Sequence, residues 1–402
     1  MTDTILAKLR ETTPATPNIL RRGFRPFFLA AGLWAFFALT IWVAWNGGEV
    51  SLFSSFPPVH WHAHEMIYGF GMAALAGFLL TAIPNWTGRL PYRGWPLAGL
   101  VLLWLAGRLA TIFSAFIGAT AALVIDLAFP VLFTLLVARE IAAGRNWRNL
   151  PAVAVVALLT LGNAIMHLED FGIAWGGPVG LRLGIAALVM LIVLIGGRVT
   201  PSFTRNWLVK NGGRKLPASF DQLDKICLGT TLVALAAWVL SNNGTAVGVL
   251  ATLAAAANLV RLVRWRGLRT LAEPLVFVLH LGYLWVPLSF ALLAAAQWHP
   301  QIPPTTAIHA FTVGAVGTMI LAVMTRATLG HSGRPLKASG DTVFIYMLIT
   351  LAALCRIAAT LWTGSYLPLL ATAALGWMGA FGLFTVVYGP MLLAARTDGK
   401  PD

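Results

Sequence analysis

Twelve apolar runs of roughly twenty residues follow one another along the 402-residue chain, and they leave it few ways to fold. The runs begin near residues 27, 62, 95, 117, 149, 178, 222, 245, 272, 303, 340 and 366. As a helix, each run is long enough to cross the hydrocarbon core of a bilayer. Hydrophobic residues make up 58% of the chain and charged residues only 10%, which excludes an ordinary soluble domain. The sequence therefore predicts an all-α integral membrane protein, a bundle of twelve transmembrane helices.

The basic residues are distributed unevenly between the connections of these runs. Odd-numbered connections contain no Lys or Arg, whereas even-numbered connections and both tails hold nearly all of them. By the positive-inside rule, both termini are expected to be cytoplasmic, with tails at residues 1–26 and 396–402 around a transmembrane domain at 27–395. The rule also accounts for the net charge of +14, so we exclude nucleic acid as a partner and expect the lipid bilayer instead.

Three alternating histidines, His60, His62 and His64, open the second run, and Glu65 follows them. Ionisable groups near hydrocarbon are rare unless they are paired, bound to an ion or placed in a wet cavity. Imidazole binds copper, zinc and iron and is an axial ligand of haem. The pattern indicates a metal or cofactor site, and the alternative is a helix end wetted by interfacial polar side chains.

Other ionisable residues fall inside the predicted spans. Arg108, Arg182 and Arg356 lie in the outer halves of spans 3, 6 and 11, and Asp126 lies in the outer half of span 4. Buried charges in one leaflet tend to pair or to line a polar cavity. We interpret these residues as members of salt bridges, with haem propionates as the alternative partners of the three arginines.

The remaining histidines are biased toward the outer side on this topology. Glu169 and Asp170 adjoin one of them, His167, and add candidate metal ligands. Only His280 and His331 are predicted nearer the cytoplasm. The six outer histidines are His60, His62, His64, His167, His299 and His309.

The chain also repeats itself. Setting His64 on His309 aligns H-E-M-I-Y-G with H-A-F-T-V-G, and Gly88-Arg89 then falls on Gly333-Arg334 with no gap. The sixth span ends in a similar motif, G-G-R-V-T-P, but begins with no histidine. The spacing of four helices between the copies predicts three four-helix arcs. Small residues on spans 2 and 10 favour close helix packing or, alternatively, a flat macrocycle between the helices.

Several long motifs together resemble the NnrS family, and they cover nearly the whole chain. They are R-R-G-F-R-P-F-F-L (21–29), W-H-A-H-E-M (61–66), G-F-L-L-T-A-I-P-N-W-T-G-R (77–89), G-G-R-V-T-P-S-F-T-R-N (196–206), H-L-G-Y-L-W (280–285) and the stretch 309–336 that begins H-A-F-T-V-G. The resemblance implies a multi-pass protein of the bacterial inner membrane that contains haem, expected to be of the b type, and copper. It also implies a link to denitrification, nitric oxide and nitrosative stress.

The family's motif histidines fall here on His62, His64, His280, His309 and His331. His60 stands where the family pattern leads us to expect a small residue, so it is the weakest ligand candidate among the three alternating histidines. The resemblance does not supply a turnover reaction.

A fainter resemblance links the chain to the catalytic subunit of haem-copper oxidases, which also has twelve helices and histidines at the outer ends of spans 2 and 10. Two departures weaken it. Span 7, residues 222–241, contains no histidine, and span 10 lacks a second histidine two residues from His309. Of the cofactor sites of those oxidases, the sequence is consistent only with the haem that is held by two histidines.

We therefore predict a haem protein of the inner membrane, also binding copper, that serves in nitric oxide or nitrosative-stress metabolism. The equivalent positions of His64 and His309 make them the predicted haem ligands. His62 points about 200° away from His64 on a helix. It is expected to bind copper, with His167 as a candidate neighbour, while His280 and His331 form an alternative site. The alternative function is transport or binding of a metal, haem or a nitrosyl-iron species, and whether the chain catalyses a reaction stays open.

Overall fold

The computed structural model describes residues 16–241 and 243–400, and this part of the chain is helical without a single strand. Twelve of its helical segments are long and apolar enough to cross a membrane, which confirms the predicted count. Nine of these described segments are built on one helix each: α2 (Phe24–Asn46), α5 (Trp95–Ile112), α7 (Ala119–Ala143), α8 (Leu150–Asp170), α11 (Gln222–Leu240), α12 (Gly244–Val263), α13 (Pro274–Trp298), α16 (Gly340–Leu361) and α17 (Tyr366–Leu393). Short helical turns occur at η1 (Asn18–Leu20), α6 (Ser114–Ile117), η3 (Trp147–Asn149), η5 (Gly267–Thr270) and η7 (Thr363–Ser365).

Spans 2, 6 and 10 are each interrupted by a π-helix, a rare form that is frequent at functional sites. In spans 2 and 10 the π-helix starts directly after His64 and His309, whereas in span 6 it starts deeper in the membrane. This shared interruption supports the predicted equivalence of spans 2 and 10. The segments are α3 (Pro58–His64), η2 (Glu65–Gly71) and α4 (Met72–Thr87); α9 (Val179–Leu191), η4 (Ile192–Gly196) and α10 (Gly197–Lys210); α14 (Pro304–His309), η6 (Ala310–Gly317) and α15 (Thr318–His331).

Spans 2 and 10 also end alike. Gly88 follows α4 with a φ of +70°, and Gly333 comes shortly after α15 with a φ of +76°. Only glycine adopts this left-handed conformation without a steric cost, and it is the common way to stop a helix. The aligned glycines of the sequence repeat therefore have the same structural role.

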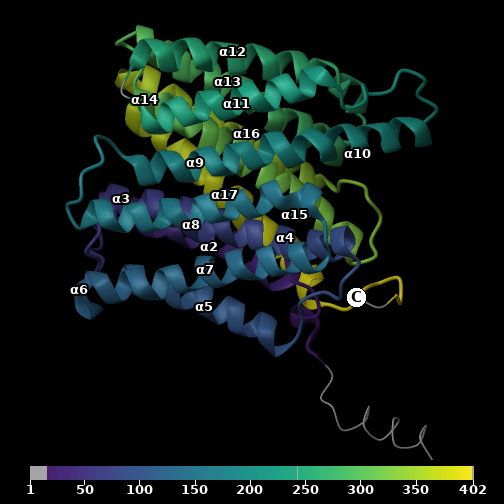
Figure 1. Ribbon diagram of the computed structural model, residues 1–402, viewed down its shortest axis with the longest axis horizontal. Coiled ribbons are helices and arrows are strands. Elements are labelled where there is room, and N and C mark those ends of the chain that lie inside the picture. The colour runs from purple at the N-terminus through teal and green to yellow at the C-terminus, as the bar shows by residue number, and fades with distance from the viewer. Residues whose placement is uncertain (1–15, 242, 401–402) are drawn as a thin grey trace, which may run out of the picture.

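The helices lie side by side and roughly parallel (Figure 1), and their contacts join them into three arcs of four spans each. Contacts run through spans 3, 4, 5 and 6, through spans 7, 8, 9 and 10, and through spans 11, 12, 1 and 2, where α17 packs against α2. Each arc ends on an interrupted span, and the three interrupted spans contact one another at the centre through α4, α9, α15, η2 and η6. The predicted three-arc bundle is thus observed.

Glycines at the centre allow neighbouring spans to approach closely. A Cβ atom on Gly77 would lie 2.6 Å from the Phe28 ring, and one on Gly314 would lie 2.6 Å from the Trp285 ring. Such close contact supplies van der Waals energy, which drives helix association in a membrane where the hydrophobic effect does not. At these two positions the small residues serve helix packing and not a macrocycle.

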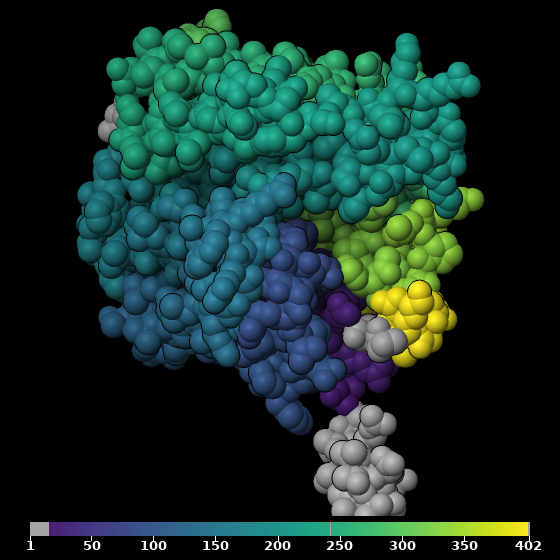
Figure 2. All heavy atoms as spheres, turned by 45° about the vertical axis from the view of Figure 1, so that its right-hand side comes forward, coloured from purple at the N-terminus to yellow at the C-terminus, as the bar shows by residue number. Residues whose placement is uncertain are grey.

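Arg25 joins the start of span 1 to the end of span 12. Its side chain is fully buried, and Nη1 donates to the carbonyl oxygens of Leu392 (2.9 Å) and Ala394 (2.6 Å). The described ends of the chain consequently lie at one end of the bundle, which we call the terminal end and which Figure 2 turns toward the reader. The opposite end carries α3 and α14, and we call it the histidine end.

Candidate functional site

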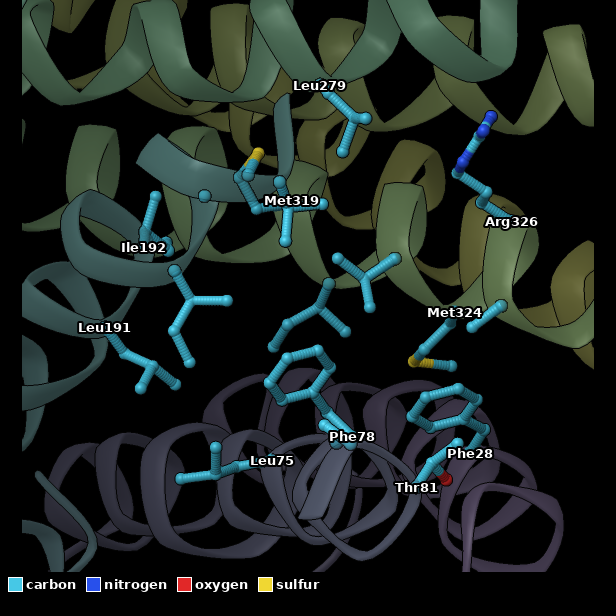
Figure 3. Close-up of a pocket in the computed structure, with 18 of the residues that line it drawn as sticks. Phe28, Leu75, Phe78, Thr81, Leu191, Ile192, Leu279, Met319, Met324 and Arg326 are labelled. Atoms are coloured by element: carbon cyan, nitrogen blue, oxygen red, sulfur yellow. The ribbon is translucent and has the colours of Figure 1, made fainter. Parts of the chain in front are cut away.

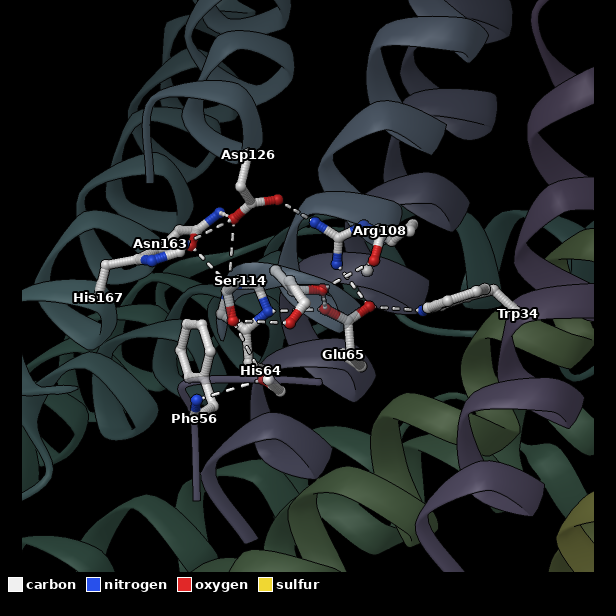
Figure 4. A network of polar contacts seen from close by, with 12 residues as sticks. Trp34, Phe56, His64, Glu65, Arg108, Ser114, Asp126, Asn163 and His167 are labelled. Atoms are coloured by element: carbon white, nitrogen blue, oxygen red, sulfur yellow. Dashed lines mark hydrogen bonds and ion pairs between the residues drawn. The ribbon is translucent and has the colours of Figure 1, made fainter. Parts of the chain in front are cut away.

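A buried polar network fills the histidine end between spans 1 to 5 (Figure 4). Its anchor is Glu65, the first residue of η2, which accepts hydrogen bonds from Arg108 Nη1 (2.7 Å), Trp34 Nε1 (2.7 Å) and Thr111 Oγ1 (2.9 Å). The second terminal nitrogen of Arg108 pairs with Asp126. Arg108 and Asp126 are thus members of salt bridges, as expected for charges buried in one leaflet, and Glu65 is a partner that the sequence did not reveal.

His64 lies on the other side of the two carboxylates. Its Nδ1 is 2.9 Å from Glu65 Oε1, and its Nε2 is 2.8 Å from Asn163 Oδ1 and 3.1 Å from Asp126 Oδ2. The same Asp126 oxygen accepts from Asn163 Nδ2 at 2.8 Å and lies 3.1 Å from His167 Nε2. Both ring nitrogens of His64 are therefore already held by neighbouring oxygens.

The formal charges of this network do not cancel. With neutral imidazoles, one guanidinium faces two carboxylates, because Arg108 lies between Glu65 and Asp126. A net charge buried within a membrane protein is costly. One more positive charge is needed, and either a proton on an imidazole or a bound metal cation supplies it.

His64, Asp126 and His167 have the spacing of a metal site. Their candidate ligand atoms lie within 4.8 Å of one another, and all three side chains are buried. Nitrogen and oxygen ligands bind zinc at about 2.0–2.2 Å, so two ligands of one ion lie roughly 3 Å apart. The two 3.1 Å separations around Asp126 Oδ2 match this spacing, and imidazole also suits copper. The same distances suit hydrogen bonds in a network without metal.

A second group lies on the opposite face of α3. The His62 ring stacks on Trp42 with centroids 4.3 Å apart, and its Nδ1 is buried without a hydrogen-bond partner in the described chain. His309 donates from Nδ1 to the Thr305 carbonyl oxygen at 2.7 Å, which leaves Nε2 for a ligand. Arg356, on α16, lies within electrostatic range of both histidines. Its Nη1 is likewise buried and has no partner among residues 16–241 and 243–400.

A family model described as NnrS protein matches residues 18–396 of the chain. The chain belongs to the NnrS family. No curated protein matches it. Membership supports a membrane protein connected with the nitric oxide response, and the buried His-Asp-His group fits the association of NnrS proteins with metal cofactors.

In this NnrS protein, the two-residue spacing of His62 and His64 has the predicted effect, since the two side chains occupy different faces of one helix. His64 is held by residues of spans 2, 4 and 5, and His62 faces Trp42 of span 1 together with His309 and Arg356. The alignment of the internal repeat pairs His64 with His309, but in the structure it is His62 that lies within electrostatic range of His309. His167, predicted as a neighbour of His62, contacts His64 instead.

Two further candidate site residues, His60 and Arg182, bind neighbouring protein groups. His60 Nδ1 lies 2.8 Å from Asp170 Oδ1 at the histidine end, and His60 is half-exposed. Arg182 donates from Nη1 to the Trp238 carbonyl oxygen at 3.2 Å. The observed bond of Arg182 therefore goes to a backbone oxygen and not to a carboxylate.

His280 and His331 have different observed surroundings. His280 Nε2 is 2.7 Å from Thr204 Oγ1, while the His331 ring packs at 5.5 Å from the Phe24 ring. A shared metal site made of these two histidines remains a prediction.

Asn163 is a member of the network that sequence reasoning missed. The signal was present, because a side-chain amide inside an apolar span is as rare as a charge and tends to face a polar partner. It lies four residues before His167, one turn along α8, so both side chains reach Asp126 from the same helix face.

Proposed function

We propose that this protein binds haem between His62 and His309 and copper at His64, Asp126 and His167, and acts in nitric oxide or nitrosative-stress metabolism linked to denitrification. We assign it to the bacterial inner membrane with both termini cytoplasmic. The observation that carries the haem assignment is that two imidazoles and the Arg356 guanidinium lie within electrostatic range of one another, and that each has a nitrogen without a hydrogen-bond partner in the described chain. We reassign His64 from haem to the metal site because its Nε2 faces Asp126 Oδ2, at 3.1 Å, and not His309.

The residues around His62 suit a haem. Neutral imidazole nitrogens are axial ligands of haem iron, and a guanidinium pairs well with a propionate. The Thr305 carbonyl fixes the His309 ring so that Nε2 is the free nitrogen, and the stacked Trp42 limits rotation of His62. His62 and His309 would hold the haem, which would then supply electron transfer or sensing.

The residues around Asp126 suit a metal cation. Copper accepts imidazole ligands, and a cation would balance the second carboxylate of the network. Glu65 at His64 Nδ1 and Asn163 at Asp126 provide the outer hydrogen bonds that orient metal ligands.

Absorption spectroscopy of the purified protein tests the haem assignment. Alanine substitutions of His62 and of His309 should each remove the Soret band or convert a low-spin to a five-coordinate spectrum. The matched control is His299→Ala, an exposed histidine at the end of α13. Loss of haem in His64→Ala with full retention in His62→Ala would contradict the assignment. A colourless protein that moves metal into vesicles would favour transport, the alternative function.

Metal analysis of the folded, size-exclusion-purified protein tests the copper assignment. His167→Gln leaves the pairs of Arg108 with both carboxylates intact, so it should lower the copper content and spare the haem. The control is Asp170→Asn, which removes a carboxylate at the same end of the bundle. An unchanged copper-to-protein ratio in His167→Gln would refute this metal site.

A further inference from the structure

A cavity of about 660 Å³ lies in the terminal half of the bundle, between the three interrupted spans (Figure 3). Its walls come mainly from residues 71–86 of span 2, 188–203 of span 6 and 316–331 of span 10. At 1.5 Å per residue, each of these stretches rises about 22 Å. The cavity is therefore elongated along the three spans.

The walls are apolar over most of this length. Leu75, Leu191 and Ile192 point inward at one end in Figure 3, and Phe78 and Met319 line the middle. An apolar cavity favours hydrocarbon and disfavours a polar solute, because polar groups would lose their hydrogen bonds to water there.

Two cations, Arg198 and Arg326, are among the residues that line the cavity. The Arg326 guanidinium lies 4.0 Å above the Phe203 ring, and the bond from Arg198 to Asn149 Oδ1 is long, at 3.5 Å. Within the described chain, neither guanidinium has a carboxylate partner at ion-pair distance. The charged neighbours that act on Arg198 are themselves arginines, while Glu273 acts on Arg326 from a longer distance. Guanidinium groups in this setting favour an anion.

We propose that this cavity binds a lipid anion, with its hydrocarbon chain between spans 2, 6 and 10 and its carboxylate or phosphate at Arg198 and Arg326. The chemistry is shared by a fatty acid and by an anionic phospholipid that inserts one acyl chain. The lining extends to Trp86, Phe203 and His331, toward the terminal ends of α4, α10 and α15. Both proposed cofactor sites lie at the histidine end, so this assignment does not depend on them.

Binding of radiolabelled oleate to the full-length, delipidated protein in a neutral detergent tests the proposal. Binding should be saturable, and oleyl alcohol, which has the same chain without the charge, should compete at least about tenfold less well. Arg198→Gln and Arg326→Gln should each weaken oleate binding about tenfold, as expected for the loss of a hydrogen bond between charged groups. The control is Arg205→Gln, an exposed arginine on the same helix as Arg198.

A chain-blocking variant and a competition assay complete the test. Ala327→Phe places a ring in the cavity wall and should abolish binding of both oleate and oleyl alcohol while the size-exclusion profile is kept. Displacement by phosphatidylglycerol at lower concentration than by unlabelled oleate would identify a phospholipid as the source of the chain, and the reverse order a fatty acid. Equal affinity for oleate and oleyl alcohol, or unchanged binding in both arginine variants, would overturn the proposal.

Discussion

Replacing Arg108 by glutamine tests the charge balance at the histidine end. Arg108 is 2% exposed and is the cation between Glu65 and Asp126. Removing one partner of a buried ion pair typically costs about 3–5 kcal/mol, because the other charge is left uncompensated. Arg108→Gln leaves two carboxylates together, so we expect a loss at the upper end of that range.

Asp126→Asn should cost less, about 1.5–3 kcal/mol for the lost charged hydrogen bond, because Arg108 still has Glu65. The double variant keeps only one carboxylate, so part of the loss caused by Arg108→Gln should be recovered. We expect the two losses to deviate from additivity by about 2 kcal/mol, within the range seen for residues in direct contact.

The free energy of unfolding is measured by titrating the metal-free protein with a denaturing detergent in mixed micelles. Arg182→Gln is the matched control, since Arg182 also lies within a span but donates to a backbone oxygen at 3.2 Å. Additive effects within about 0.5 kcal/mol, the limit for independent sites, would refute the charge accounting. The charge accounting would also be refuted if Arg108→Gln lowered the free energy of unfolding by no more than Arg182→Gln does.

Three further outcomes are expected. Gly314→Ala should lower the free energy of unfolding by about 1–3 kcal/mol in the same titration, because its Cβ would lie 2.6 Å from the Trp285 ring. As the control, Gly229→Ala on α11 places its Cβ in open space and should leave the free energy of unfolding unchanged or raise it. A hydrogen bond from Arg264 lowers the pKa of Asp221, the N-cap of α11, from 3.8 to about 2. The ionised Asp221 carboxylate therefore stabilises the fold above pH 4, and this contribution is lost as the pH falls toward 2. The melting temperature of the parent protein should fall more over that interval than the melting temperature of Asp221→Asn, because the asparagine keeps the helix cap but does not titrate. A fluorescent protein fused to the C-terminus should be active and alkaline phosphatase inactive if that terminus is cytoplasmic, and the opposite result would invert the predicted topology.

The span count and the three arcs could be predicted because a bilayer restricts what can cross it. Apolar runs of fixed length mark the spans, and the match between His64 and His309 located two equivalent helices before any contact was known. The structure adds the physical basis of that match, which is a π-helix that begins at the next residue in both spans.

The partners of the histidines could not be predicted in the same way. Sequence spacing places His62 and His64 on different faces, but it does not say which face turns toward span 10, because that depends on the rotation of the whole helix. The pairing of Glu65 with Arg108, 43 residues away, depends on the packing of two arcs in three dimensions. The cavity has no local sequence signal either, since its walls are mainly ordinary apolar residues from three distant spans.

The attachment of Arg25 has a consequence for how the protein is made. A chain emerges from the ribosome N-terminus first, and its early segments begin to fold before the later ones exist. The carbonyl oxygens that Arg25 binds belong to Leu392 and Ala394, 367 and 369 residues later, so they are synthesised long after it. Throughout translation the guanidinium of span 1 must stay solvated or use temporary partners, and it reaches its final place only when span 12 arrives. Closing the ring of helices is thus a late step of biogenesis, and a nascent chain truncated before span 12 would expose a charged residue that the finished protein buries completely.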